Sequence, residues 1–189
     1  MYPEAMVSLE NNGCIDDSVI SAFLEILRHS YKDHISKIFV MDLFQVQHNF
    51  MNPRSDWRPS FIKWVSKIAF FDYKIWILPV GGNDHWTLLV VIPKLKILLY
   101  HDSYYGMPSD LIINSVCEFI ETYLTSHINW DEWTLHVPND IPYQATNGLF
   151  QLNCGVHLCS WAYVIFSGTF FQFSDSNRCQ TSEKIWQTF

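Results

Sequence analysis

Charged side chains are scarce in this chain of 189 residues: they make up 16% of it, against 49% for hydrophobic residues. This balance excludes a disordered chain, because enough apolar material is present to bury a sizeable core. The few Lys and Arg residues form no dense basic block, and the formal net charge is −7. A nucleic-acid partner therefore has little electrostatic support.

Long hydrophobic runs and a regular cysteine framework are also missing. The apolar stretches are strand-length or interrupted by polar residues, so neither a transmembrane helix nor a membrane partner is expected. No apolar signal segment opens the chain, and the five cysteines are odd in number and irregularly spaced. Both facts favour free thiols and an intracellular setting, in the nucleus or the cytoplasm. Without repeats or linkers, we expect one α+β domain over residues 1–189, of a size that can be monomeric.

The hydrophobic spacing predicts helices on both sides of a group of strands. Three neighbouring strands are separated by Gly- and Pro-containing turns, which indicates an antiparallel core sheet. A mixed stretch at 38–50 is interpreted as a short helix or loop, and 138–153 as a loop. The predicted helices cover 17–30, 61–68, 111–124 and 154–166, and the predicted strands cover 75–79, 86–92, 95–101 and 133–137.

Cys154 lies where a loop rich in Gly and Asn turns into the last predicted helix. Free N–H groups at a helix N-terminus favour a thiolate, and they can also hold the oxyanion of a tetrahedral intermediate. Gly155 beside it permits the close approach of a substrate backbone. Cys154 is thus a candidate nucleophile; the alternative is a small, unreactive core residue.

His85 and Asp102 are candidates for a general base and the acid that orients it. His85 follows a turn and opens a strand, and Asp102 closes the next strand. In a hairpin these two ends lie side by side, so the carboxylate can hold the imidazole in one tautomer. Taken singly, His85 fits a turn residue and Asp102 a turn or cap residue. His101 is a second possible base, but strand alternation places it on the opposite face from Asp102.

Five short runs occur in an order that resembles the SUMO/ubiquitin-like-specific cysteine proteases, also called sentrin-specific or Ulp-type proteases. They are IWILP at 75–79, HWTL at 85–88, YHDS at 100–103, IPYQ at 141–144 and NCGV at 153–156. Upstream, residues 15–20 resemble the family's opening helix motif, and residues 61–64 resemble the segment before its central sheet. The resemblance covers about residues 14 to 167.

The resemblance implies a papain-like cysteine protease fold, with a central antiparallel sheet flanked by helices and the nucleophile at a helix N-terminus. It implies hydrolysis after the C-terminal glycine of a ubiquitin-like protein, with a SUMO-type modifier as first choice, and neither a cofactor nor a metal. Cys154 would be the nucleophile, His85 the base and later the acid, and Asp102 the orienting group. Trp86 would flank the channel for the substrate tail.

Three positions depart from the family's pattern. The family completes its oxyanion hole with a Gln before the Cys. Gln144 has the matching Ile-Pro-x-Gln context but four extra residues follow it, whereas Gln151 is nearer to the Cys without that context; we favour Gln144. Asn153 replaces a usual Asp, and we count it with Trp86 and Gly155 as substrate-binding. Cys14 stands where a Trp usually covers the tail channel.

Three other interpretations stay open. Cys154, His157 and Cys159 could suggest a metal site, but residue 159 points away from the other two on a helix, and no second pair follows at zinc spacing. A related acyl-transfer enzyme or maturation protease would use the same order of His, acid and Cys. A catalytically weakened domain that only binds a ubiquitin-like protein would fit the altered loop and the missing Trp.

Overall fold

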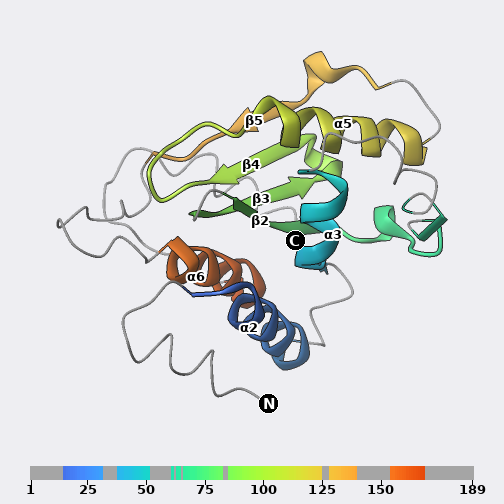
Figure 1. Cartoon of the computed structure of the whole chain (residues 1–189). Helices are drawn as coiled ribbons and strands as arrows, with labels where there is room; N and C mark the ends of the chain where they lie inside the picture. The colour runs from blue at the N-terminus through green and yellow to red at the C-terminus, as the bar shows by residue number, and fades with distance from the viewer. Residues whose placement is uncertain are drawn as a thin grey trace.

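The computed structural model describes residues 15–31, 38–51, 61, 63–64, 66–82, 85–124, 128–139 and 154–168. These residues form one five-stranded sheet, in the order β1-β2-β3-β4-β5, with helices on both faces (Figure 1). The expected α+β class is confirmed. In chain order the elements are α2 (Asp17–Ser30), β1 (Ile38–Val40), α3 (Leu43–Asn49), η3 (Phe70–Asp72), β2 (Ile75–Gly82), β3 (His85–Ile92), η4 (Pro93–Leu95), β4 (Ile97–His101), α5 (Asp110–Leu124), η5 (Trp130–Glu132), β5 (Thr134–His136) and α6 (Cys154–Ser167).

The sheet is mixed rather than wholly antiparallel. Its centre, β2-β3-β4, is antiparallel as predicted, with Leu78 opposite Leu89 and Tyr100 on the far side of Leu89. The edge strands β1 and β5 run parallel to their neighbours. A parallel neighbour needs a crossover connection, and α5 fills that role between β4 and β5. The prediction of a helix or loop at 38–50 was therefore incomplete, because this stretch contains β1 as well as α3.

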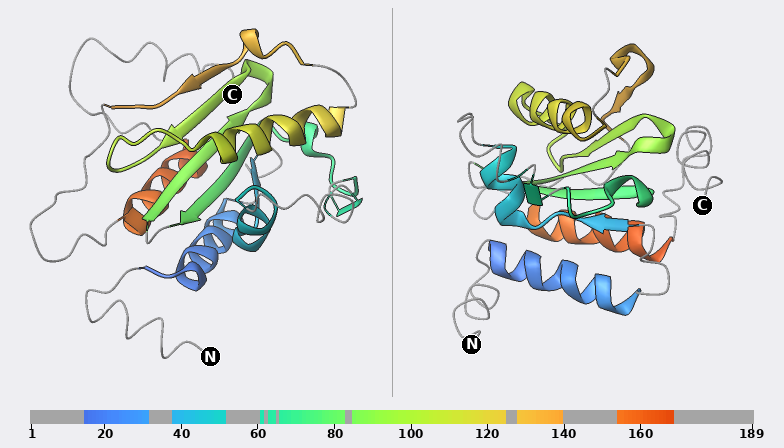
Figure 2. Two further views of the ribbon diagram at one scale, coloured as in Figure 1. Left: turned by 45° about the horizontal axis from the view of Figure 1, so that its top comes forward. Right: turned by 90° about the vertical axis from the view of Figure 1, so that its right-hand side faces the viewer.

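One face of the sheet is covered by α6, which lies between the sheet and α2 (Figure 2). Leu158 and Ala162, on the inward side of α6, have no exposed surface and share a core cluster with Leu88 and Val90 of β3. Helix α2 begins where Asp16 accepts a hydrogen bond from the Val19 N–H at 3.0 Å, a normal N-cap. The packing of α6 between the sheet and α2 fixes where α6 starts, and therefore where Cys154 lies.

The opposite face carries an aromatic core under α3 and α5. Phe70 has no exposed surface, and its ring contacts those of Trp76 and Phe119 at 5.5 and 5.3 Å between centroids. The Trp76 indole donates to the Phe70 carbonyl at 2.9 Å, which satisfies its buried polar atom. Because both faces are covered, β2 and β3 are almost continuously buried and show little polar alternation.

The other predicted elements agree with the structure where residues are described, except that residues 66–68, predicted as the end of a helix, form a turn and a bend. Phe61, Lys63 and Trp64 are helical, and the rest of the predicted 61–68 helix is partly outside the described residues. Most of the predicted 138–153 loop lies outside them too. Within the described part of the chain, no helix has the length and apolar character needed to cross a bilayer.

Candidate active site

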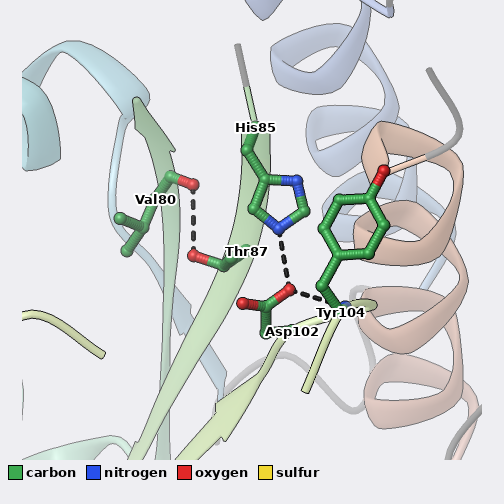
Figure 3. A network of polar contacts seen from close by, with 5 residues as sticks. All are labelled: Val80, His85, Thr87, Asp102 and Tyr104. Carbon is green, nitrogen blue, oxygen red and sulfur yellow. Dashed lines mark hydrogen bonds and ion pairs between the residues drawn. The ribbon is translucent and has the colours of Figure 1, made fainter. Parts of the chain in front are cut away.

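The β3–β4 hairpin brings His85 and Asp102 together. The ladder ends with Leu88 opposite His101; its continuation places Asp102 opposite Thr87, which is two residues from His85 on the same side of β3. His85 Nε2 and Asp102 Oδ1 lie 2.7 Å apart (Figure 3). The sequence prediction that these two side chains are neighbours is met by this contact.

The Asp102 carboxylate is enclosed by the loop that follows it. Asp102 is 6% exposed, and its Oδ1 also accepts the Tyr104 backbone N–H at 2.8 Å. A Cβ built on Gly106 would lie 2.4 Å from Oδ2, so only glycine allows the chain to cross the carboxylate this closely. A buried carboxylate keeps its charge at tolerable cost only when hydrogen bonds replace water, which the loop supplies.

The His85 ring is held on one edge by Asp102 and is partly exposed to solvent. Its side chain is 23% exposed. A carboxylate at Nε2 selects the tautomer with the proton on Nε2, which leaves Nδ1 as the basic nitrogen. Nδ1 lies on the side of the ring away from Asp102 (Figure 3). The arrangement can therefore take a proton at Nδ1 while the carboxylate stabilises the resulting cation.

Cys154 is the first residue of α6 and is 2% exposed. The free N–H groups of the first turn surround this position. A Cβ on Gly155 would lie 2.9 Å from Ile15 Cβ and 3.5 Å from Trp86 Cδ1. Since Trp86 follows His85 directly, this contact brings the start of α6 to the end of the sheet where His85 begins β3.

Trp86 is fixed in place by three separate contacts. Its indole N–H donates to the Ile15 carbonyl at 2.9 Å, which ties β3 to the segment just before α2. Gly81 of β2 lies opposite Trp86 in the β2–β3 ladder. A Cβ on Gly81 would lie 2.3 Å from the indole ring, so the glycine leaves the space that the ring occupies. Gly155 provides the third contact. Trp86 thus borders the start of α6, and its role beside a substrate channel stays a prediction.

The other His and Cys residues of β4 and α6 that could act as base or nucleophile have surroundings unlike those of His85 and Cys154. The His101 ring stacks on Trp161 of α6, at 5.1 Å between centroids, and so faces away from Asp102 as predicted. Burial, with His136 nearby, lowers the pKa of His101 to about 3. Burial also raises the pKa of the Cys159 thiol to about 11 and lowers the pKa of His157. His101 is thus a poor base, and Cys159 a poor nucleophile, at neutral pH.

Some predicted residues are not placed by the structure. Gln144, Gln151, Asn153 and Cys14 lie outside the described residues, so the choice between the two glutamines stays a prediction. Among the described residues, no group of three or more His, Cys, Asp or Glu side chains is arranged to hold a metal ion.

Sequence reasoning missed three contributors: Gly81, Tyr104 and Gly106. The glycines act through close approach, and Tyr104 through its backbone N–H and its ring, which lies 4.9 Å from that of His85. A Gly within a strand and another just after the predicted acid were the available signals.

Comparison with known proteins identifies the family to which the chain belongs. The model of the Ulp1 protease family, C-terminal catalytic domain, matches residues 14–189. Human sentrin-specific protease 2 is 25% identical over 165 residues, which cover 84% of this chain and 26% of the relative. The chain thus spans about a quarter of the length of that curated relative.

Two solved structures show the same fold. A de-sumoylating protease superposes with a TM-score of 0.71 at 17% identity, over 87% of this chain and 67% of the other. The C-terminal Ulp1 protease domain, solved in complex with Smt3, the yeast ortholog of SUMO, superposes with a TM-score of 0.68 at 17% identity, over 89% and 73%. The papain-like fold implied by the sequence is confirmed, and the chain belongs to the Ulp1 protease family of cysteine peptidases.

Proposed function

We propose that this domain hydrolyses the peptide or isopeptide bond after the C-terminal glycine of a ubiquitin-like modifier of the SUMO type. One observation supports this proposal most: a buried carboxylate orients His85 at the same end of the sheet where α6 begins with Cys154. Thiol, imidazole and acid are the three groups that nucleophilic cysteine catalysis requires.

In the proposed reaction, His85 Nδ1 takes the proton of the Cys154 thiol, and the thiolate attacks the carbonyl carbon of the terminal glycine. The N–H groups at the start of α6 stabilise the oxyanion, and Gln144 (or Gln151) adds a side-chain donor. The imidazolium then gives its proton to the leaving amine, so a thioester remains. Water attacks the thioester while His85 takes its proton; the tetrahedral intermediate collapses, releases the modifier and returns the proton to the Cys154 thiolate.

The substrate assignment rests on the residues that border Cys154. A Gly-Gly tail offers only backbone to recognise, so it suits a narrow channel between flat, fixed walls. Trp86, held by Ile15 and Gly81, supplies one wall, and Gly155 leaves room beside the nucleophile. Asn153 would contact the tail next to them. The known complex of a Ulp1 protease domain with Smt3 makes a SUMO-type protein the first partner to test.

The test is labelling by a panel of ubiquitin-like proteins that carry a C-terminal thiol-reactive warhead. We expect one SUMO-type member to label the wild type and Cys159→Ala, but not Cys154→Ala. Cys159 is a matched control because it lies in the same helix with a high thiol pKa. Labelling of Cys154→Ala would overturn the proposal. Failure of every member to label a Cys154 that reacts with small reagents would favour another substrate or a binding-only role.

A further inference from the structure

Tyr104 lies against the imidazole of His85. The two ring centroids are 4.9 Å apart and the planes are inclined by 31° (Figure 3). The same residue donates its backbone N–H to Asp102 Oδ1 at 2.8 Å, the oxygen that also contacts His85 Nε2. Tyr104 therefore contacts both members of the His–Asp pair, one through its ring and the other through its backbone.

The loop around Tyr104 is built rigidly enough to hold this ring in place. Tyr105 adopts a left-handed backbone conformation, φ 57°, and its N–H donates to the Asp102 carbonyl at 3.0 Å. Gly106 then crosses the second carboxylate oxygen. A left-handed non-glycine residue is costly and persists only where its surroundings fix it. The turn from Asp102 to Gly106 thus fixes the backbone that carries Tyr104.

An aromatic face 4.9 Å from an imidazole has two physical consequences. It covers one face of the ring, which restricts its rotation and keeps water from the His85–Asp102 contact. It also attracts the ring when that ring becomes a cation, because cation–π attraction extends to about 6 Å from the aromatic centroid. A neutral His85 gains much less from the same contact.

We infer that Tyr104 is a positioning residue that holds the His85 imidazole and stabilises the imidazolium formed when Cys154 gives up its proton. This inference rests on the proposed function, since it takes Cys154 and His85 as partners. The Tyr104 ring would then raise the fraction of Cys154 present as thiolate at neutral pH. No contact with substrate is needed for this effect.

The experiment is the pH dependence of Cys154 alkylation by iodoacetamide, read by mass spectrometry of the peptide that contains Cys154. Tyr104→Phe keeps the aromatic face and should match the wild type. Tyr104→Leu keeps bulk without that face; we expect alkylation about fivefold slower at pH 7, with its midpoint at higher pH. Tyr105→Leu makes the same change one residue later and should match the wild type.

The outcomes separate the inference from the proposed function. If Tyr104→Leu alkylates like the wild type, the inference is wrong, whatever the enzyme cleaves. If wild-type Cys154 reacts no faster than Cys159, the proposed function fails first. If Tyr104→Leu does not fold, pentafluorophenylalanine at position 104 keeps the ring shape and reverses its electrostatics. It should slow alkylation as Leu would, and behaviour like Tyr104→Phe would overturn the inference.

Discussion

The two sides of the β3–β4 hairpin end carry two histidines in opposite surroundings. His85 is part-exposed, contacts the Asp102 carboxylate at 2.7 Å and directly precedes Trp86, which borders the start of α6. His101, at the end of the adjacent strand, is stacked against Trp161, and its buried Nδ1 has no hydrogen-bond partner among the described residues. His101 lies opposite Leu88 in the ladder, and Asp102, one residue later, continues the ladder opposite Thr87. This step of one residue puts the two side chains on opposite faces of the sheet.

The comparison teaches that surroundings, rather than residue type, decide which histidine can act as a base. A carboxylate and access to water let an imidazole accept a proton, as at His85. Burial without a partner opposes the charged form, which is why the pKa of His101 falls to about 3. Substitutions at the two histidines, and then around the proposed nucleophile, can test this contrast.

The largest expected loss of activity should distinguish His85 from His101 directly. We expect His85→Ala and Cys154→Ala each to lower kcat/KM by on the order of 10⁵-fold or more, because base and nucleophile act as one unit. His101→Phe, which keeps a flat ring against Trp161, should stay within about tenfold of the wild type. Hydrolysis of a ubiquitin-like protein with a fluorogenic C-terminal amide measures all three. Normal activity in Cys154→Ala would sink the assignment, and equal losses in His85→Ala and a folded His101→Phe would remove the contrast.

Replacement of the orienting acid should give the next largest loss. Asp102→Asn keeps the shape but presents an amide to His85 Nε2, so the imidazole loses the acceptor that fixes its tautomer. We expect a folded enzyme whose kcat falls by on the order of 10³–10⁴-fold. Thermal unfolding followed by circular dichroism supplies the folding control. A kcat close to the wild type would mean that the 2.7 Å contact has no role in turnover.

The oxyanion donor tests the site from the side of Cys154. Gln144→Ala should lower kcat by about 10²–10³-fold, because a side-chain N–H to the developing oxyanion is lost. Gln151→Ala is the matched control and should have a small effect. Steady-state kinetics on the same fluorogenic substrate decides between them. The reverse result would make Gln151 the donor and would move the assignment without changing the triad.

Local pattern was enough to predict much of the fold and the contact between His85 and Asp102. Apolar spacing after Asp16 predicted the helix that the structure has at Asp17–Ser30, and turns with Gly or Pro predicted the three central strands. Strand alternation alone separated His101 from Asp102. The hairpin then predicted the contact between Asp102 and His85, because two-strand registers depend on residues close in sequence.

The remaining features depend on contacts between distant segments. The edge strand β1 is short and has little sequence pattern of its own; it forms because β2, already present, accepts it. The edge strand β5 was predicted at 133–137, but its parallel pairing with β4 was not. Tyr104 and Gly106 act through the path of a loop, which no periodicity encodes. Nothing in the sequence around Gly81 indicates its role, because that role depends on the Trp86 ring on the neighbouring strand.

The smallest expected effect is a change in folding stability rather than in turnover, and it tests the surroundings of His101. The pKa of His101 is about 3 in the folded chain and 6.5 as its ordinary value. Between these pH values the unfolded chain binds a proton that the folded chain does not, so stability falls as the pH drops below 6.5. By pH 5 this one group should lower the free energy of unfolding by about 2 kcal/mol.

Urea unfolding of wild type and His101→Phe at pH 7 and pH 5 isolates that contribution, because every other titrating group is common to both. We expect the wild type to lose about 2 kcal/mol more than the variant over this interval. His157→Phe is a useful companion, since burial lowers the pKa of His157 as well and its ring also contacts Trp161. Equal losses of stability in wild type and His101→Phe would mean that the charged ring donates a hydrogen bond to an acceptor within the fold. The two sides of the hairpin would then differ less than their geometry implies.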